Sequence, residues 1–366
     1  MPFFKKIGIV GVGVIGASLG LSIRRVFPNV EIIGVSSKKT IDEALSAGAI
    51  DTGFVRENIN LCLEQSDLIF LCTPISHILE ILPRVAESVR PGTMVTDVGS
   101  TKKEIVDNAG SCFPEGVYFL GGHPMAGNEG RGVKWADALL FENAVYVLTP
   151  SRPIPVSMTR DFGDLIEKIG AKVIFMGPGL HDRVAAMVSH LPQILAVALM
   201  NFVTQDPGDA ELFLKLAAGG FRDMTRIASS PFDIWHDIIS TNQDQISRHI
   251  DGFISVLGEV QTMLGKEELG NLFQKAARNR LSIPRDTKGF LKAHFDLSVR
   301  VEDRPGVIAA MTGVLADRDI NIKDIEVLKV REGDAGTIRL SFETEKDRSE
   351  AGKLLDQIGF SSRYRD

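Results

Sequence analysis

A glycine-rich loop near the start of the chain, Gly11-Val12-Gly13-Val14-Ile15-Gly16, constrains the fold more than any other segment. It follows the apolar run Ile7–Val10 and precedes residues with helical spacing. In a strand–turn–helix unit, the first glycine permits the tight turn, the second lets a pyrophosphate approach the backbone, and the third allows close packing of helix on strand. Free N–H groups at the start of the helix would bind the phosphates. We therefore predict a dinucleotide site formed by Gly11, Gly13, Val14, Ile15 and Gly16, with a turn that binds no ligand as the alternative.

The residues after the second predicted strand, Glu31–Val35, indicate which dinucleotide the chain binds. In NAD-binding domains an acidic residue at this place holds the ribose 2′-hydroxyl, but this chain has Ser36-Ser37-Lys38-Lys39. Hydroxyl and ammonium groups would attract the 2′-phosphate of NADP, whereas a carboxylate would repel it. The sequence thus leaves NAD and NADP open, with an inclination to NADP through Ser36, Ser37 and Lys38; a solvated helix start is the alternative. Thr73 and Pro74, after the predicted strand Leu68–Cys72, are expected to line the same site.

The order of apolar and helical segments divides the chain into three predicted domains. In residues 1–178, fully apolar runs alternate with helical patterns, which is typical of a parallel sheet covered on both faces in an α/β Rossmann domain. Residues 179–284 show helical spacing alone and predict an all-helical domain. Residues 293–366 predict an α+β domain with βαββαβ order, and Ile283–Gly289 predicts a linker. The strands expected in the first domain are Ile7–Val10, Glu31–Val35, Leu68–Cys72, Met94–Asp97, Tyr118–Gly121, Ala144–Leu148 and Lys172–Phe175.

Charge and composition argue against several classes of protein. The formal net charge is −6 and the pI is about 5.7, which argues against a nucleic-acid or anionic-membrane partner, so an anionic substrate must be attracted by local Arg and Lys clusters. The three cysteines are odd in number and lack CxxC spacing, which argues against a disulfide framework or a metal site and favours a reducing cytoplasm. The apolar region Val184–Val203 is interrupted by Ser189, His190, Pro192 and Gln193, so it predicts a buried helix and not a membrane span.

Two loops at the carboxyl ends of predicted strands carry groups suited to catalysis. The first contains Ser100, and the second contains His123 between Gly122 and Pro124, with Glu129 following. Ligands of open α/β sheets bind at this edge, and an imidazole suits a general base near neutral pH. A histidine in a loop is also a common structural hydrogen-bonding residue, so this position alone leaves both roles open.

Two further clusters lie in the predicted helical domain. One helix carries His181, Asp182 and His190, of which the last two are a little over two turns apart and lie on roughly the same side. A later segment places Arg222 and Arg226 four residues apart, where two guanidinium groups could receive a carboxylate. A pair of arginines on a solvated helix face is the alternative.

The clusters and their order resemble the prephenate/arogenate dehydrogenase (cyclohexadienyl dehydrogenase) family over about residues 6–284. The segments GGHPMAG (121–127), SHLPQ (189–193) and GGFRDMTRIA (219–228) together carry the resemblance. It implies that His123 binds the ring hydroxyl of the substrate and that Ser100 helps to orient it. It also implies that Arg226 binds the ring carboxylate and that His190 lies beside the pyruvyl side chain. Substrate contacts are further expected for Arg222, Glu129, Gly219 and Trp235.

The resemblance implies an oxidoreductase of tyrosine biosynthesis that converts prephenate to 4-hydroxyphenylpyruvate, with loss of carbon dioxide and reduction of NAD(P)⁺. Hydride would leave C4 while His123 takes the hydroxyl proton, and aromatisation would drive the reaction. Oxidation of arogenate directly to tyrosine is the alternative, and Glu129 is expected to discriminate between the two side chains.

Two other functions are compatible with the glycine-rich loop. A sensor that binds cofactor and amino acid without turnover would not need His123, His190 and Arg226. A β-hydroxyacid dehydrogenase would carry a lysine on the first helix of the helical domain, and Leu180–Leu199 contains none.

The last predicted domain resembles an ACT domain, a small module that commonly binds amino acids between paired copies. The resemblance rests on Glu302-Asp303-Arg304-Pro305-Gly306-Val307 and on Asn321-Ile322 before the next strand. It implies an amino-acid effector, with tyrosine expected, near Asp303, Gly306, Asn321 and Ile322; a purely dimerising domain is the alternative. We expect a homodimer, because apolar helices such as Leu191–Phe202 would otherwise lie exposed.

Overall fold

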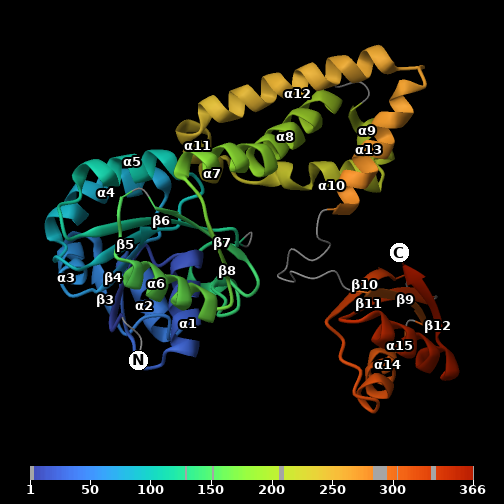
Figure 1. Ribbon diagram of the computed structural model, residues 1–366, viewed down its shortest axis with the longest axis horizontal. Coiled ribbons are helices and arrows are strands. Elements are labelled where there is room, and N and C mark those ends of the chain that lie inside the picture. The colour runs from blue at the N-terminus through green and yellow to red at the C-terminus, as the bar shows by residue number, and fades with distance from the viewer. Residues whose placement is uncertain are drawn as a thin grey trace. The chain divides into compact units, whose positions relative to one another are not determined.

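A computed structural model describes residues 4–127, 130–150, 152–205, 210–282, 295–302, 304–330 and 335–365. The chain divides into two compact units, Met1–Lys275 and Ala276–Asp366 (Figure 1). Three predicted features lie outside the described residues, namely Glu129, Asp303 and the linker Ile283–Gly289.

An eight-stranded sheet forms the first part of the larger unit, in the order β3-β2-β1-β4-β5-β6-β7-β8. Its strands are β1 (Lys6–Val10), β2 (Glu31–Ser36), β3 (Thr52–Val55), β4 (Leu68–Leu71), β5 (Met94–Asp97), β6 (Tyr118–Pro124), β7 (Val145–Pro150) and β8 (Lys172–Phe175). The connecting helices are α1 (Val14–Val26), α2 (Lys38–Ser46), α3 (Ile59–Leu63), α4 (Ile75–Ser88), α5 (Lys103–Cys112) and α6 (Val156–Lys168), with the 3₁₀ turns η1 (Arg56–Asn58) and η2 (Val133–Trp135).

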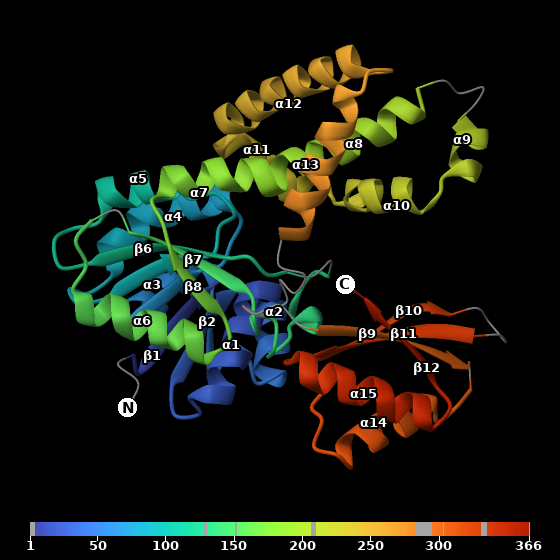
Figure 2. The same cartoon turned by 45° about the vertical axis from the view of Figure 1, so that its right-hand side comes forward.

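Alternate side chains of the central strands enter separate cores on the two faces of this sheet. In β4, Leu68 and Phe70 join the core that includes α1 and α6, whereas Ile69 and Leu71 join the core that includes α4 and α5. Figure 2 shows these two pairs of helices on opposite faces. A strand buried on both faces has a continuous apolar sequence, which is why most of these strands could be predicted. The exception is β3, whose residues are partly buried or exposed and include Gly53.

The sheet is mixed, which corrects the prediction of a parallel sheet. Strands β1 to β6 are parallel, but β7 pairs antiparallel with β6, and β8 is parallel to β7. A parallel neighbour would need a long crossover, usually helical, and the described residues between β6 and β7 contain only η2.

The position of His123 is a second correction. The residue lies within β6, opposite Val147 of β7, and not in the loop predicted from the sequence. Pairing with β7 fixes the backbone from which the imidazole projects.

Every regular element in the described residues of the second part of the larger unit is a helix, which confirms the predicted helical domain. It begins with a continuous run of α7 (Pro178–Ala185), the single π turn η3 (Ala186–His190) and α8 (Leu191–Val203). The following elements are α9 (Ala210–Leu216), α10 (Gly219–Thr225), the 3₁₀ turn η4 (Arg226–Ser229), α11 (Phe232–Thr241), α12 (Gln243–Met263) and α13 (Glu268–Ser282), in which the boundary between the units falls. The helical spacing of residues 232–257 is interrupted at Asn242, where φ is −131° and α12 begins with the next residue.

The run Pro178–Val203 is long and apolar enough to cross a membrane by length and composition, a test that core helices of soluble proteins also pass. Of its most apolar window, 22% is buried within the chain, so the prediction of a buried helix is wrong for a single chain. Met187, Val188 and Phe202 are among its exposed side chains. An apolar surface of this length indicates association with another surface.

The smaller unit contains a four-stranded antiparallel sheet in the order β10-β11-β9-β12. Its elements in chain order are β9 (Phe295–Glu302), α14 (Val307–Ala316), β10 (Asp324–Val330), β11 (Ala335–Phe342), α15 (Glu345–Gln357) and β12 (Ser361–Arg365). The predicted βαββαβ order is therefore confirmed, including its final strand. A core of its own, with Leu297, Met311 and Phe342 fully buried, accounts for its separation as a unit.

Candidate active site

The glycine-rich loop has the backbone geometry that a pyrophosphate-binding turn requires. Gly11 has a φ of +97°, and a Cβ there would lie 2.7 Å from the backbone of Cys72. A Cβ at Gly16 would lie 2.3 Å from the Gly11 carbonyl oxygen, so α1 packs directly on the turn. Gly13 differs, because a Cβ there would meet nothing within 4 Å, and no side chain in the described part of the chain caps α1. The N–H groups of the first turn of α1 are thus available to a phosphate.

Thr73 adds a second feature that fits a ligand at this turn. Its Cγ2 lies 2.8 Å from the Cβ position of Gly11, and Pro74 directly precedes α4. The Thr73 Oγ1 atom is buried and has no hydrogen-bond partner among the described residues. Because an unsatisfied buried hydroxyl costs about 1–3 kcal/mol, a ligand that hydrogen-bonds here would be stabilised. The residues at this turn therefore fit a dinucleotide.

Ser37 and Lys38, which follow β2, make their polar contacts with α2. The Ser37 Oγ atom caps α2 by accepting the N–H of Thr40 at 3.3 Å. Lys38 pairs with Asp42 one turn later, and Ser36 is buried at the end of β2. Lys38 thus has a carboxylate partner in its own helix at an exposed position, which is compatible with the alternative of a solvated helix start.

His123, buried at the end of β6, is the residue around which the candidate site is built. Its Nδ1 lies 2.8 Å from Nε2 of His181, and the two rings meet edge to face with 5.0 Å between centroids. Burial lowers the pKa of His123 well below its ordinary value, and charge on His181, Lys102 and His190 acts in the same direction. His123 is therefore a neutral imidazole near pH 7, the form in which it can accept a proton.

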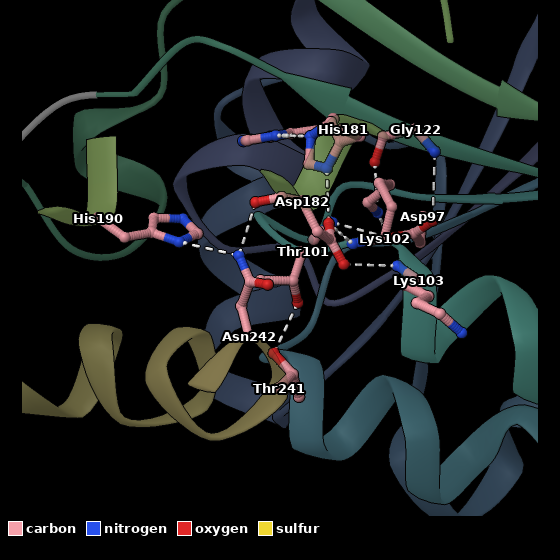
Figure 3. Close-up of polar contacts among 12 residues, drawn as sticks. Asp97, Thr101, Lys102, Lys103, Gly122, His181, Asp182, His190, Thr241 and Asn242 are labelled. Atoms are coloured by element: carbon pink, nitrogen blue, oxygen red, sulfur yellow. Dashed lines mark hydrogen bonds and ion pairs between the residues drawn. The ribbon is translucent and has the colours of Figure 1, made fainter. Parts of the chain in front are cut away.

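Asp182 and Asn242 connect the helical part to the edge of the sheet. The Asp182 carboxylate accepts the backbone N–H groups of Lys102 (2.7 Å) and Lys103 (2.8 Å) at the start of α5. The amide nitrogen of Asn242 donates to the backbone carbonyl of Asp182 at 2.8 Å and lies 3.2 Å from Nδ1 of His190 (Figure 3). Asn242 thus connects the backbone of Asp182 to the ring of His190 across the π turn η3, whereas a common side of the helix for the two side chains stays a prediction.

His190 is 2% exposed and stands at the end of the π turn. Because the Asn242 amide nitrogen also faces a carbonyl oxygen, it must be a donor, and His190 Nδ1 must accept from it. In a neutral imidazole the proton is then on Nε2. Burial lowers the pKa of His190 to about 4, with the Asp182 carboxylate acting in the opposite direction. The ring of Trp235 packs edge to face on this imidazole at 6.0 Å, so His190 offers a neutral N–H donor beside an aromatic wall.

A fully buried ion pair supports the end of β6. Lys102 pairs with Asp97, and neither side chain is exposed. Lys102 Nζ also donates to the carbonyl of Gly122 at 2.7 Å, and the Gly122 N–H donates to Asp97 at 3.2 Å. Burial lowers the pKa of Lys102, and the Asp97 carboxylate opposes that shift. The pair holds the residue before His123 through both of its backbone groups.

The arginine segment is attached to α8 but stays at the surface. Gln193, which is 4% exposed, donates its side-chain N–H to the carbonyl of Ile227 at 3.1 Å. The side chains of Arg222 and Arg226 are both exposed, and Arg222 donates to the carbonyl of Ala217 at 3.2 Å. The structure therefore places these arginines beside the helix of His190 but outside the buried cluster.

The other predicted substrate residues are placed as follows. Ser100 is half-buried in the loop between β5 and α5, and Gly219 begins α10.

Two members of the buried cluster, Lys102 and Asn242, were given no role from the sequence. The only signal for Asn242 is an asparagine, a frequent capping residue, inside a helical pattern. For Lys102 it is a lysine in the loop that follows the predicted strand Met94–Asp97.

In the smaller unit, the predicted effector residues lie at the start of α14 and before β10. Gly306 has a φ of +88° and directly precedes α14, which no side chain caps in the part of the chain that the structure describes. Asn321 is exposed, and Ile322 packs against the core of this unit. The N–H groups of α14 are thus open to an anionic group such as a carboxylate.

Fold and site together define a class of enzyme. A dinucleotide-binding turn and a buried neutral histidine stand at the carboxyl ends of parallel strands, where open sheets bind their ligands. A helical domain brings a second neutral histidine to the same edge. This is a dehydrogenase that uses a nicotinamide dinucleotide.

Comparisons with known proteins identify its family. Residues 19–175 match the profile of the prephenate dehydrogenase nucleotide-binding domain, residues 177–277 that of its dimerization domain, and residues 295–358 that of the ACT domain. The prephenate dehydrogenase of Bacillus subtilis is 35% identical over 353 residues, 95% of each chain. The chain belongs to the prephenate dehydrogenase family and carries an ACT domain, which confirms both resemblances.

Two solved structures show the same fold for the larger unit. One is prephenate dehydrogenase from Aquifex aeolicus in complex with hydroxyphenyl propionate and NAD⁺, with a TM-score of 0.70 and 31% identity over 76% of this chain and 98% of that one. The other is arogenate dehydrogenase of Synechocystis, with a TM-score of 0.68 and 32% identity over 75% of this chain and 98% of that one.

Proposed function

We propose that the protein oxidises prephenate to 4-hydroxyphenylpyruvate with loss of carbon dioxide. The observation that carries the proposal is His123, a buried and neutral imidazole at the sheet edge that also holds the glycine-rich loop. The nicotinamide dinucleotide, when bound, supplies the hydride acceptor. His123 accepts the proton of the C4 hydroxyl and returns it to the phenol oxygen once the ring is aromatic. The electrons of the broken bond to the ring carboxylate complete the aromatic ring, so no proton is consumed.

The substrate carries two carboxylates, and the site offers a partner for each. His190 presents a neutral Nε2–H donor to the pyruvyl side chain, beside Trp235. Arg226, with Arg222 near it, binds the ring carboxylate. Gln193 supports this role because it ties the arginine segment to α8, the helix that follows His190. Orientation by these groups lets His123 meet the hydroxyl at the roughly 3–3.5 Å that reaction requires.

The choice between NAD and NADP belongs to the proposal as well. Lys38 has a carboxylate partner in Asp42, which weakens the argument for NADP, and the Aquifex relative was crystallised with NAD⁺. Gly11, Gly13, Gly16 and Thr73 hold the part that both dinucleotides share.

Initial rates test the proposal. Purified protein is assayed with prephenate and with arogenate, each with NAD⁺ and with NADP⁺, by absorbance of the reduced nicotinamide. We expect turnover with prephenate, and a His123→Asn variant should lose about 10²–10⁴-fold in kcat. His77→Asn, at a half-exposed histidine on α4, is the matched control and should leave the rate unchanged. A preference for arogenate would show that the same reaction is catalysed on arogenate and gives tyrosine directly. Absence of turnover in all four pairings would refute the proposal.

Association and regulation complete the proposal. The exposed apolar run Pro178–Val203 and the match of residues 177–277 to a dimerization domain support a homodimer. The uncapped start of α14, with Gly306, Asn321 and Ile322 around it, supports binding of tyrosine as effector. Sedimentation should give twice the chain mass, and millimolar tyrosine should change the rate. A cytoplasmic location remains a prediction from the sequence.

A further inference from the structure

A row of three buried side chains ends at His123. Nδ1 of His123 lies 2.8 Å from Nε2 of His181, and Nδ1 of His181 lies 2.7 Å from Oδ1 of Asp182. The three residues are 9%, 3% and 2% exposed, respectively. Figure 3 shows the ring of His181 next to the Asp182 carboxylate.

The positions of the protons follow from which atoms can donate. The Asp182 carboxylate already accepts the N–H groups of Lys102 and Lys103, and an ionised carboxylate cannot donate. Nδ1 of His181 must therefore carry the proton that it shares with Asp182. A neutral His181 then has a lone pair on Nε2, so Nδ1 of His123 must carry a proton and donate it there. This leaves a lone pair on Nε2 of His123.

We propose that His181 and Asp182 are positioning residues that fix His123 in the tautomer with a free Nε2 lone pair and share the positive charge that His123 acquires. The inference rests on the proposed function, because it names the atom that takes the hydroxyl proton. In other enzymes a catalytic histidine is held in one tautomer by a hydrogen bond to a carboxylate. When that carboxylate is replaced, the histidine adopts the wrong tautomer.

The surroundings of His123 explain why such support is needed. A charged imidazole is costly in a buried place, and the charge of the Lys102 ammonium lowers the pKa of His123 further. Burial and this ammonium keep His123 neutral at rest but also oppose the charge that it must carry during the reaction. Donation from Nδ1 to a ring that is itself hydrogen-bonded to a carboxylate offsets part of that cost.

His181 is a better residue to change than Asp182. Asp182 also accepts the N–H groups at the start of α5, so its replacement would disturb the helix whatever its role in catalysis. His181→Phe keeps an aromatic ring at this position, though a somewhat larger one, and removes both nitrogens. His181→Gln places an amide oxygen near the position of Nε2, where it can still accept from His123.

The test combines kinetics with a spectrum that does not depend on turnover. We expect His181→Phe to lower kcat by about 10²–10⁴-fold with an unchanged KM, and His181→Gln to recover part of the loss. ¹⁵N spectra of the histidine rings are recorded on cofactor-free protein, with His123→Asn to assign the signals. His123 should be protonated on Nδ1 in the unmodified protein and in His181→Gln, and on Nε2 in His181→Phe.

Three outcomes are decisive. An unchanged kcat in His181→Phe overturns the proposal and leaves the proposed function standing. Equal losses in both variants, with the His123 tautomer unchanged, show a purely structural His181 and overturn it too. If the unmodified protein turns over none of the substrates, the proposed function fails, whereas the spectra still decide whether His181 sets the tautomer.

Discussion

The amide nitrogen of Asn242 lies 3.2 Å from Nδ1 of His190 and 2.8 Å from the backbone carbonyl of Asp182. One side chain thus determines which nitrogen of His190 carries its proton. His190 receives a hydrogen bond at Nδ1, whereas His123 donates one from Nδ1 to His181. The two neutral histidines of the site therefore differ at Nε2. This atom carries the proton in His190 and can donate it, whereas in His123 it carries a lone pair and can accept. The site needs both, one to hold an anionic side chain and one to take a proton.

Asn242→Asp should raise the pKa of His190 from its value of about 4. A carboxylate beside Nδ1 favours the charged imidazole, and its oxygens cannot donate to the Asp182 carbonyl. We also expect a loss of about 1–3 kcal/mol in stability, because a buried acceptor loses its donor. A proton NMR titration of the His190 ring measures the pKa. Asn242→Leu is the control, since it removes the donor without adding charge, and an equal pKa in both variants would contradict the argument.

Alanine at Gly11 and at Gly13 should separate folding from cofactor binding. At Gly11 a Cβ would stand 2.7 Å from backbone atoms at a φ of +97°, so Gly11→Ala should lower the melting temperature and abolish dinucleotide binding. At Gly13 the Cβ position is open among the described residues, so Gly13→Ala should fold normally. Its dinucleotide affinity should fall at least about tenfold, or about 1.4 kcal/mol, because the added methyl would occupy the place of the pyrophosphate. Thermal melts measure the melting temperature, and fluorescence titration with NADH and NADPH measures the affinity. An unchanged affinity in Gly13→Ala would show that the pyrophosphate does not bind at this loop.

The sequence predicts what depends on neighbours along the chain. Strands such as Leu68–Leu71 are apolar throughout because both faces of the sheet are buried, and the loop Gly11–Gly16 is recognisable because the backbone needs glycine there. The reversal of β7 could not be predicted, because an apolar run such as Val145–Leu148 contains nothing that sets its direction. The role of Asn242 could not be predicted either, since its partners His190 and Asp182 are 52 and 60 residues away.

Stability should fall as the pH falls below about 6.5, in part because of His190. Its pKa is about 4 in the folded protein and about 6.5 in an unfolded chain. Between these values the unfolded chain binds more protons, so this contribution is fully present above pH 6.5 and is lost toward pH 4. The loss amounts to at most about 3 kcal/mol, and burial of neutral His123 adds a loss of the same sign. Melting temperatures at pH 7.5, 6 and 5 should fall less steeply for His190→Asn than for the unmodified protein, and parallel curves would contradict this assignment.

Lys102→Met should be strongly destabilising, whereas Lys103→Met should have little effect. Lys102 is fully buried and is the cation that faces Asp97, so its removal leaves a buried carboxylate without a counter-charge, at a cost of about 3–5 kcal/mol. Lys103, the next residue, is exposed and pairs with Asp107 one turn later, a surface pair worth about 0.3–0.5 kcal/mol. Denaturant unfolding measures the difference. A double variant, Lys102→Met with Asp97→Asn, removes both charges and should recover part of the lost stability, because the cost arises from the unpaired charge. Equal destabilisation in the single and double variants would show instead that the donation from Lys102 to the Gly122 carbonyl carries the effect, and kcat would then fall in both because Gly122 holds His123 in place.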